Sequence, residues 1–458
     1  MDEPAPYAEP LDPRAQRREI LRLAVPAFLA LVAEPLFLLT DSAIVGHLGT
    51  SQLAGLGVAS AALLTAANIF VFLAYGTTAV VARQLGAGSR RGAIAAGVDG
   101  TWLAVALGLA TAVVVAVLAR PICSAFGASG PAVDQAVTYL RIAALGIPGM
   151  LVVLATTGVL RGLQDTRTPL VVSVLGFGSN IGLNLLLVFG IGLGIAGSAI
   201  GTVIAQTGMA AILAWVLVRM ARREGAHLRA HPGRVLAAAR DGAPLLVRTL
   251  ALRAILLLTT WVAASYGTVP LAAYQVTATI WSFLTFTLDA LAIAAQALTG
   301  RALGAGDRRA ARSATVVMVR WGVLGGFVVG LILVALRDVL PHLFTSDPEV
   351  RAVISAGLLV VALGQPLSGY VFVVDGVLIG AGDGRWLARA MVACLVAYLP
   401  VVAGLHALGP WLVSDASAVL GEEHAITWLW LGFTVFMAVR GALMWLRVRT
   451  DRWMVTGA

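Results

Sequence analysis

The chain is built from apolar runs of twenty or more residues, which recur from its first fifty residues to its last forty. A run of about 20 apolar residues is long enough to cross a bilayer as an α-helix. The runs are continuous and do not alternate with a period of two, which excludes a transmembrane β-barrel. Only 12% of the residues are charged, compared with about 25% in soluble domains. We therefore expect an all-α polytopic membrane protein, because backbone polar groups in lipid must be satisfied within helices.

Hydropathy predicts about twelve membrane-spanning helices, six in each half of the chain. In the first half, the helix cores lie near residues 20–45, 53–82, 93–119, 133–160, 168–190 and 195–221. In the second half, they lie near residues 236–264, 270–299, 311–336, 351–379, 386–408 and 425–447. An even number of spans places both ends of the chain on the same side of the membrane.

The basic residues, all of them arginine, indicate which side that is. They gather before the first predicted helix and in every second loop after it, whereas the alternate loops hold few, such as Arg120, Arg337 and Arg351. Arginine is enriched in the cytoplasmic loops of membrane proteins. We therefore expect a cell-membrane protein with both termini in the cytoplasm. The same distribution explains the net charge of +9, so we expect no nucleic-acid partner.

The chain also repeats itself at an offset of 218 residues, as when residue 82 matches residue 300. ARQLGAGSRR at 82–91 matches GRALGAGDRR at 300–309, and GVLRGLQDTR at 158–167 matches GVLIGAGDGR at 376–385. Because each copy contains an even number of spans, both copies enter the membrane from the same side, as in transporters with parallel repeats. Such a repeat predicts two pseudo-symmetric six-helix lobes with a cleft between them.

Domain boundaries follow from this repeat. We assign a cytoplasmic N-terminal tail, an N-lobe, a cytoplasmic linker, a C-lobe and a cytoplasmic C-terminal tail to residues 1–18, 19–222, 223–235, 236–449 and 450–458. Two lobes that rock about a central cavity are the geometry of alternating access. We expect a monomer in the lipid bilayer, because the repeat already supplies the two-fold cleft.

The first predicted helix carries two carboxylates, Glu34 and Asp41, which are costly inside a membrane. They are seven residues apart and so share one face of the helix. Pro26 and Pro35 remove backbone hydrogen bonds from the same helix and favour a bend. We predict an ion-coupling site here, whose geometry changes when the helix bends. The alternatives are an interfacial position for Asp41 and a permanently neutral, hydrogen-bonded Glu34.

Amide and hydroxyl side chains on other predicted helices could complete that site. Asn180 and Asn184 lie one turn apart, Thr202 follows in the next helix, and Asn68 lies in the second helix. Each alone is typical of packing between membrane helices. Together with a carboxylate they indicate a proton or cation relay. We assign the first three residues to ion coupling and Asn68 to substrate binding.

The second half carries intramembrane charges of its own. Asp289, Asp375 and Arg253 are predicted substrate-binding residues, and Arg248 lies near them on the same helix as Arg253. A buried arginine without a partner is very costly. We therefore predict that Asp375 pairs with Arg253. The alternative is a static internal ion pair with no role in transport.

No pattern in the sequence indicates an enzyme. The segments LGAGSRR and LGAGDRR lack the features of a phosphate-binding loop, so we interpret their glycines as helix ends. Cys123 and Cys394 lie in different halves and are interpreted as apolar packing residues. We expect no metal and no cofactor, and we expect an ion gradient to drive transport. One proton that crosses about 100 mV supplies about 2.3 kcal/mol.

These features together resemble the multidrug and toxic compound extrusion (MATE) family, in particular its DNA-damage-inducible protein F (DinF) branch. The resemblance covers the chain from about Arg17 to Arg449. It rests on the segments AEPLFLLTDSAIVGHLG, YGTTAVVARQLGAG, GVLRGLQDTRTPL and DGVLIGAGD. The family implies twelve helices in two pseudo-symmetric bundles that form a V. It also implies secondary antiport, in which H⁺ or Na⁺ flows inward while a substrate leaves.

The resemblance implies roles for individual residues. Asp41 matches the family's ion-coupling carboxylate, Asn180 and Thr202 match its hydrogen-bonding neighbours, and Pro26 matches the proline at which the first helix is thought to bend. Several relatives carry an aspartate where this chain has Asn184. The loss of a second carboxylate weakens a Na⁺ site, because a hard cation prefers negatively charged oxygen ligands. We therefore expect H⁺ coupling through Asp41, with Na⁺ as the alternative.

The resulting hypothesis is an antiporter that exports small organic molecules, cationic or amphipathic, by alternating access. Protonation of Asp41 rearranges its hydrogen bonds, and the first helix bends. Two other transport functions stay open: export of a citrate-like organic anion, which Arg248 and Arg253 would suit, and flipping of a lipid-linked precursor. Outside transport, the alternative is a membrane scaffold or receptor.

Overall fold

The computed structural model describes residues 13–127, 130–413 and 418–457, and all regular elements in these ranges are helical. The first half contains α1 (Pro13–Gly46), α2 (Thr50–Phe70), α3 (Phe72–Gly86), α4 (Arg90–Val117), α5 (Ala119–Ala125), α6 (Pro131–Ala144), α7 (Ile147–Gly162), α8 (Arg167–Leu185), η1 (Leu186–Gly190) and α9 (Gly194–Arg223). The second half contains α10 (Pro232–Ser265), α11 (Thr268–Gly304), α12 (Arg308–Leu336), η2 (Leu340–Leu343), α13 (Pro348–Gly380), α14 (Gly384–Val413), α15 (Ala418–Arg449) and η3 (Asp451–Trp453).

The longer of these helices are apolar enough to cross a membrane. In the described ranges there are eleven such spans, and a twelfth if α6 and α7, which meet at an angle of 52°, form one bent span. The helices α2 and α3 together form the single span Thr50–Gly86, interrupted only at Val71. The prediction of an all-α, multi-pass membrane protein with about twelve spans is confirmed.

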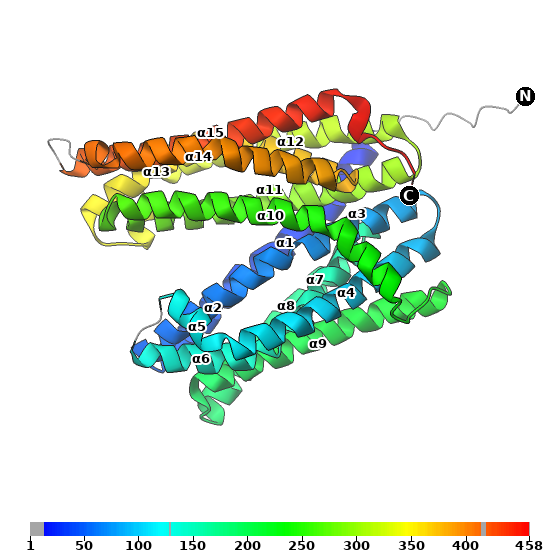
Figure 1. The fold of residues 1–458 in the computed structure, drawn as a ribbon, viewed down its shortest axis with the longest axis horizontal. Coiled ribbons are helices and arrows are strands. Elements are labelled where there is room, and N and C mark those ends of the chain that lie inside the picture. The colour runs from blue at the N-terminus through cyan, green and yellow to red at the C-terminus, as the bar shows by residue number, and fades with distance from the viewer. Residues whose placement is uncertain (1–12, 128–129, 414–417, 458) are drawn as a thin grey trace, which may run out of the picture.

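The two halves of the chain form two bundles arranged as a V (Figure 1). One bundle, the N-lobe, contains α1–α9, and the other, the C-lobe, contains α10–α15. The bundles approach each other at the end that carries the C-terminus and diverge toward the other end (Figure 1). We call the end at which the bundles approach each other the Arg-rich end. It contains the loops 87–89 and 305–307 and the segment 450–457. The predicted pair of pseudo-symmetric lobes is confirmed.

The repeated glycine-rich segments at the Arg-rich end stop one helix and start the next. Gly88 and Gly306 adopt positive φ angles of 78° and 79°, which ends α3 and α11. Ser89 then accepts a hydrogen bond from Gly92 N at 3.1 Å, and Asp307 accepts one from Ala310 N at 2.8 Å. These two side chains are therefore the N-caps of α4 and α12. The interpretation of both segments as helix ends agrees with this geometry.

The lobes meet at the Arg-rich end through residues that are equivalent in the repeat. A Cβ atom added to Gly86 would overlap the carbonyl oxygen of Arg301, and one added to Gly304 would overlap that of Arg83. Glycine at both positions therefore lets α3 and α11 approach backbone to backbone. The contact is reciprocal, as expected for a pseudo-two-fold axis that passes between the two helices.

The two arginines of this contact each reach into the opposite lobe. Arg83 donates hydrogen bonds to the carbonyl oxygens of Ala381 at 2.7 Å and Val455 at 3.0 Å. Arg301 donates to the side-chain oxygen of Gln164 at 2.7 Å and lies 3.3 Å from Glu19. Each arginine thus links its own lobe to residues of the opposite lobe at the Arg-rich end.

The structure describes part of both predicted terminal tails. Helix α1 begins at Pro13, since proline is well tolerated in the first turn of a helix, so residues 13–18 of the predicted N-terminal tail are helical. Residues 1–12 and 458 lie outside the described ranges. At the other terminus, Trp453 is buried and Gly457 N donates to Leu303 O at 3.1 Å. The C-terminal segment therefore packs against the Arg-rich end.

Candidate functional site

The carboxylate of Asp41 lies near the end of α1 and is buried, with 2% of the residue's surface exposed. Two side chains donate hydrogen bonds to its Oδ1 atom, the Asn184 amide of α8 and the Ser198 hydroxyl of α9, each at 2.7 Å. Asp41 is therefore held inside the N-lobe by side chains of two other helices.

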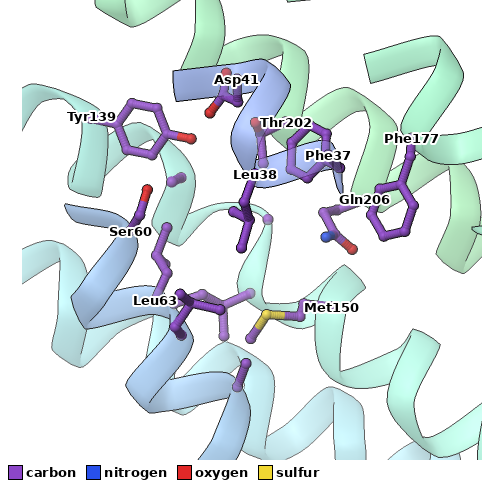
Figure 2. Close-up of a pocket in the computed structure, with 15 residues that line it drawn as sticks. Phe37, Leu38, Asp41, Ser60, Leu63, Tyr139, Met150, Phe177, Thr202 and Gln206 are labelled. Atoms are coloured by element: carbon purple, nitrogen blue, oxygen red, sulfur yellow. The ribbon is translucent and has the colours of Figure 1, made fainter. Parts of the chain in front are cut away.

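Three further polar side chains surround this carboxylate. The Asn180 amide donates to the Thr202 hydroxyl at 3.2 Å. The hydroxyl of Tyr139, from α6, points toward Asp41 (Figure 2). Four helices of the N-lobe, α1, α6, α8 and α9, thus converge on one site. We call its members the Asp41 cluster, which consists of Asp41, Tyr139, Asn180, Asn184, Ser198 and Thr202.

The Asp41 cluster has more hydrogen-bond acceptors than donors. The side-chain oxygens of Asn180 and Asn184 are buried and have no hydrogen-bond partner among the described residues. A buried acceptor without a donor costs about 1–3 kcal/mol. A proton on Asp41 converts one acceptor into a donor. Protonation of Asp41 would therefore supply the donor that the cluster lacks.

The spacing and packing of α8 and α9 place these side chains together. Asn180 and Asn184 lie one turn apart on α8, and Ser198 and Thr202 lie one turn apart on α9, so each pair shares a helix face. A Cβ atom added to Gly201 would overlap the Asn184 side-chain oxygen. Glycine is thus required on α9 where Asn184 turns toward Asp41. Immediately after α8 comes the π-helical turn η1, a geometry found frequently at functional sites.

A cavity of about 90 Å³ lies beside the cluster. Drug-sized ligands occupy pockets of about 300–1,000 Å³, whereas one water needs about 10–15 Å³. Asp41 and Thr202 reach this cavity, and the stacked rings of Phe37 and Phe177, whose centroids are 5.2 Å apart, line it together with Met150 (Figure 2). In this conformation the cavity has room for a few waters but not for a drug-sized substrate.

The structure does not place the other residues predicted for this site next to Asp41 in the same way. Asn68 donates to Leu64 O on its own helix at 2.8 Å and does not line the cavity, because its amide is satisfied one turn away. The structure therefore does not bring Asn68 to Asp41. The Glu34 side chain lies outside the described part of the chain. Pro26 and Pro35 lie inside α1, which is helical throughout, so the bend stays a prediction.

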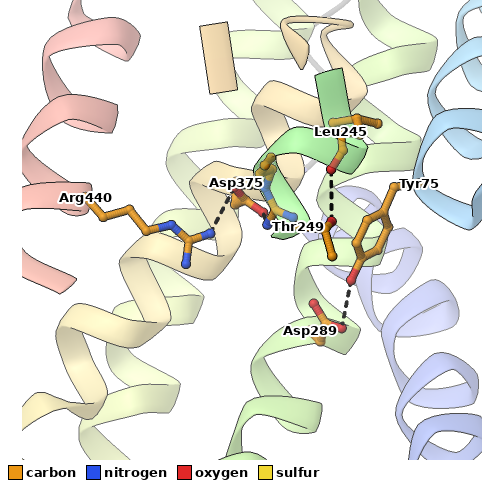
Figure 3. A network of polar contacts seen from close by, with 7 residues as sticks. Tyr75, Leu245, Thr249, Asp289, Asp375 and Arg440 are labelled. Carbon is orange, nitrogen blue, oxygen red and sulfur yellow. Dashed lines mark hydrogen bonds and ion pairs between the residues drawn. The ribbon is translucent and has the colours of Figure 1, made fainter. Parts of the chain in front are cut away.

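The C-lobe encloses a second charged group around Asp375. The Arg248 guanidinium binds both carboxylate oxygens, through Nε to Oδ1 at 3.1 Å and through Nη2 to Oδ2. The Nη2 atom of Arg440 lies 3.0 Å from Oδ1 (Figure 3). All three residues are buried, at 6%, 5% and 3% exposure for Arg248, Asp375 and Arg440. A single carboxylate thus joins α10, α13 and α15.

Asp289 lies between this group and the N-lobe. The Tyr75 hydroxyl of α3 donates to its Oδ2 atom at 3.3 Å (Figure 3). The Gln296 amide of α11 donates to the Tyr75 carbonyl oxygen at 2.5 Å. Arg161 of α7 contributes electrostatically to Asp289 from the N-lobe side. Asp289 therefore faces the boundary between the lobes, and Asp375 is enclosed within the C-lobe.

The predicted pair of Asp375 and Arg253 is wrong. Arg248 takes that position, and no described carboxylate pairs with Arg253. The two arginines are five residues apart on α10, which is a rotation of about 140° around a helix of 3.6 residues per turn. They therefore cannot both face Asp375.

Four functional candidates were missed at the sequence level. Ser198 could have been found by its spacing, one turn before Thr202 on the same helix. Arg440 could have been found as an intramembrane arginine in an apolar run. Tyr75 and Tyr139 carry no such signal, because nothing in their local sequence indicates that a carboxylate on another helix approaches them.

Comparisons with known proteins agree with this architecture. The family model described as MatE matches residues 26–186 and 244–403. The protein DETOXIFICATION 44, chloroplastic, of Arabidopsis thaliana is 32% identical over 95% of this chain and 83% of its own length. DNA damage-inducible protein F of Escherichia coli strain K12 is 27% identical over 94% of this chain and 92% of its own.

A solved structure shows the same fold at lower sequence identity. The crystal structure of MATE in the bent conformation superposes with a TM-score of 0.84 at 20% identity and covers 96% of both chains. The two blocks that match the family model fall in the two lobes, one block in each repeat. The chain therefore belongs to the MatE family, the multidrug and toxic compound extrusion transporters.

Proposed function

We propose that this transporter exports organic compounds in exchange for inward H⁺, with Asp41 as the ion-coupling group. The observation that carries the proposal is a buried carboxylate that accepts two hydrogen bonds on one oxygen, next to two amide oxygens that lack a donor. A charge held in hydrocarbon is costly, and a proton removes that charge. The same proton supplies the missing donor.

The coupling step is a rearrangement of hydrogen bonds. Deprotonated Asp41 accepts from Asn184 and Ser198, which ties α1 to α8 and α9. Protonated Asp41 donates, so it favours the unpaired oxygen of Asn180 or Asn184 instead. The two protonation states thus favour different positions of α1. Pro26 and Pro35, which interrupt the hydrogen-bond ladder of α1, make it the helix that bends.

Transport requires this local change to alter the space available to substrate. The cavity beside Asp41 holds about 90 Å³ in the described conformation. Movement of α1 changes its walls, because Phe37, Leu38 and Asp41 all belong to that helix. Proton binding and substrate binding are thereby mutually exclusive, so the proton releases the substrate. The aromatic and methionine side chains of the cavity suit amphipathic organic cations.

We further propose that the Arg-rich end faces the cytoplasm of a cell membrane. Arginine-rich loops favour that side. The lobes touch there through Gly86 and Gly304 and diverge toward the opposite end (Figure 1). The described conformation is then closed to the cytoplasm and corresponds to the outward-facing stage of the cycle.

The test is gradient-driven flux in proteoliposomes that contain the purified chain. A pH gradient is imposed without Na⁺, and uptake of a fluorescent organic cation is followed. Wild-type protein is expected to transport, and Asp41→Asn is expected to abolish flux while the protein stays folded. Asp134→Asn is the matched control, because Asp134 is exposed and pairs with Arg120 at the surface.

Two results would contradict the proposal. Normal flux in Asp41→Asn would show that Asp41 does not couple ion movement to export. Flux that requires Na⁺ and not a pH gradient would show that Na⁺ is the coupling ion. The amide oxygens of Asn180 and Asn184 would then be candidate Na⁺ ligands.

A second candidate function is export of an organic anion such as a citrate-like acid. The observation that favours it is an excess of positive charge around two carboxylates: Arg161 lies near Asp289 at the lobe boundary, and Arg248 and Arg440 both bind Asp375 within the C-lobe. The same liposomes test it when loaded with citrate in place of the cation. Citrate flux that Arg161→Gln removes, without cation flux, would favour this alternative.

A further inference from the structure

A second and larger cavity lies between the lobes at the Arg-rich end. It has a volume of about 820 Å³, and its walls come from α3 and α4 of the N-lobe and from α10, the α13–α14 loop and the C-terminal segment of the C-lobe. It shares no lining residue with the cavity beside Asp41. The ion-coupling mechanism therefore leaves it without a role.

The charge of this cavity is strongly positive. Seven arginines and three aspartates line it, an excess of four positive charges. Two of the aspartates already have basic neighbours, since Asp383 lies 2.6 Å from Arg447 and Asp99 lies 3.5 Å from His227. Arg83 already donates to the carbonyl oxygens of Ala381 and Val455. No described carboxylate forms an ion pair with the other arginines of the cavity, which are Arg234, Arg240, Arg385, Arg389 and Arg452. The cavity is thus ready to receive an anion.

The cavity also has an apolar wall that extends deep along the helices. Phe72, Leu73 and Leu245 line it together with Leu103. Leu103 is thirteen residues after the start of α4 at Arg90, which is about 20 Å along a helix axis at 1.5 Å per residue. The hydrocarbon core of a bilayer is about 30 Å thick. The apolar wall therefore runs from the Arg-rich end toward the middle of the membrane.

We propose that this cavity binds an anionic phospholipid, with its phosphate on the arginines and an acyl chain along the apolar wall. Arginine presents a planar set of donors that matches phosphate oxygens. Basic pockets between transmembrane helices at the membrane surface recognise anionic lipid headgroups. A soluble phosphate would use the arginines alone, so the apolar wall favours the lipid.

The bound lipid stabilises the closed Arg-rich end. The walls come from both lobes, so the site is complete only while α3 and α4 lie close to α10 and η3. A ligand that binds one conformation better than another shifts the population toward it. Anionic lipid in the leaflet at the Arg-rich end therefore favours the conformation described here.

Native mass spectrometry of the full chain tests binding, with phosphatidylglycerol, phosphatidylcholine and inorganic phosphate as separate probes. The variant Arg234→Gln/Arg240→Gln/Arg452→Gln removes three cavity arginines. Each arginine near a membrane surface is worth about fivefold in affinity, so we expect about a hundredfold weaker phosphatidylglycerol binding. The matched control is a triple glutamine variant of exposed arginines at the same end that do not line the cavity, at Arg222, Arg223 and Arg229. It should bind as the wild type does.

Three outcomes overturn the proposal. Equal binding of the two lipids would show that the headgroup charge is not recognised. Equal binding by the cavity variant and its control would place the lipid elsewhere. Competition by inorganic phosphate at the same concentration as phosphatidylglycerol would assign the site to a soluble anion. Lipid binding is measured without a pH gradient and without substrate flux, so failure of the ion-coupling proposal is distinguishable from failure of this one.

A second measurement tests the lipid proposal if the cavity variant does not fold. Spin labels at Arg91→Cys and Arg309→Cys report the separation of the lobes at the Arg-rich end, in a protein that keeps all cavity arginines and in which Cys123 and Cys394 have been replaced. Phosphatidylglycerol nanodiscs should enrich the short distance relative to phosphatidylcholine nanodiscs, and raised salt should reduce that difference. Identical distance distributions in the two lipids would overturn the proposal.

Discussion

The reciprocal glycine contact between α3 and α11 gives a prediction that can be worked from the structure. In the variant Gly86→Ala/Gly304→Ala, the new Cβ atoms would lie 2.8 Å from the carbonyl carbons of Arg301 and Arg83. Carbon atoms pack best at about 3.5–4.0 Å. The two helices must therefore separate by about 1 Å, and such overpacking typically costs about 1–3 kcal/mol.

This cost is specific to the closed conformation. When the lobes part at the Arg-rich end, the contact no longer exists and the alanines are tolerated. The double variant should therefore shift the conformational equilibrium toward an open Arg-rich end by about 5–150-fold, which corresponds to about 1–3 kcal/mol. The ordinary helix preference for alanine acts in the opposite direction on stability, because glycine within a helix costs about 1 kcal/mol relative to alanine.

The assay is a distance measurement between spin labels at Arg91→Cys and Arg309→Cys, after the buried Cys123 and Cys394 have been replaced. The double glycine variant should show a larger population at long distance. The matched control is Gly57→Ala/Gly325→Ala, since a Cβ atom at either position meets nothing within 4 Å. An unchanged distance distribution in the folded Gly86→Ala/Gly304→Ala protein would refute the argument.

The remaining predictions concern the two buried polar groups. Asp375→Asn should lower the free energy of unfolding by about 3–5 kcal/mol, because Arg248 and Arg440 lose the carboxylate they share. An unchanged unfolding midpoint in detergent would contradict it. Gly201→Ala should displace Asn184 from Asp41 and reduce proton-driven flux about tenfold, equivalent to about 1.4 kcal/mol within the range expected for overpacking. Wild-type flux in that variant would show that this hydrogen bond is dispensable.

Much of the Asp41 cluster could be predicted because its signals are local. A carboxylate or an amide inside an apolar run is visible in the sequence alone, and the one-turn spacing of Asn180 and Asn184 assigns both to one face of α8. The structure brings Asn184 to Asp41 and pairs Asn180 with Thr202, which lines the same cavity as Asp41. Asn68 carried the same signal but bonds to its own helix. An intramembrane polar residue therefore identifies a candidate, and its neighbours decide whether it joins the site.

The charges of the C-lobe were harder to predict because the pairing depends on helix rotation. Asp375 selects Arg248 and Arg440, and not Arg253, according to which side of α10 and α15 faces α13. Arg440 lies 65 positions beyond Asp375 in the sequence, so no local pattern connects the two. The same limit applies to Tyr139, which reaches Asp41 from a different helix.

The sequence by itself determined the number of spans, the two-fold repeat and the presence of charges inside the membrane, since apolar length, offset and composition are properties of a single chain segment. Only the tertiary structure decided which charges pair, which glycines touch across the lobes and where an arginine-lined cavity forms. Those features arise from side chains far apart in the sequence, and their contacts exist only once the helices have packed.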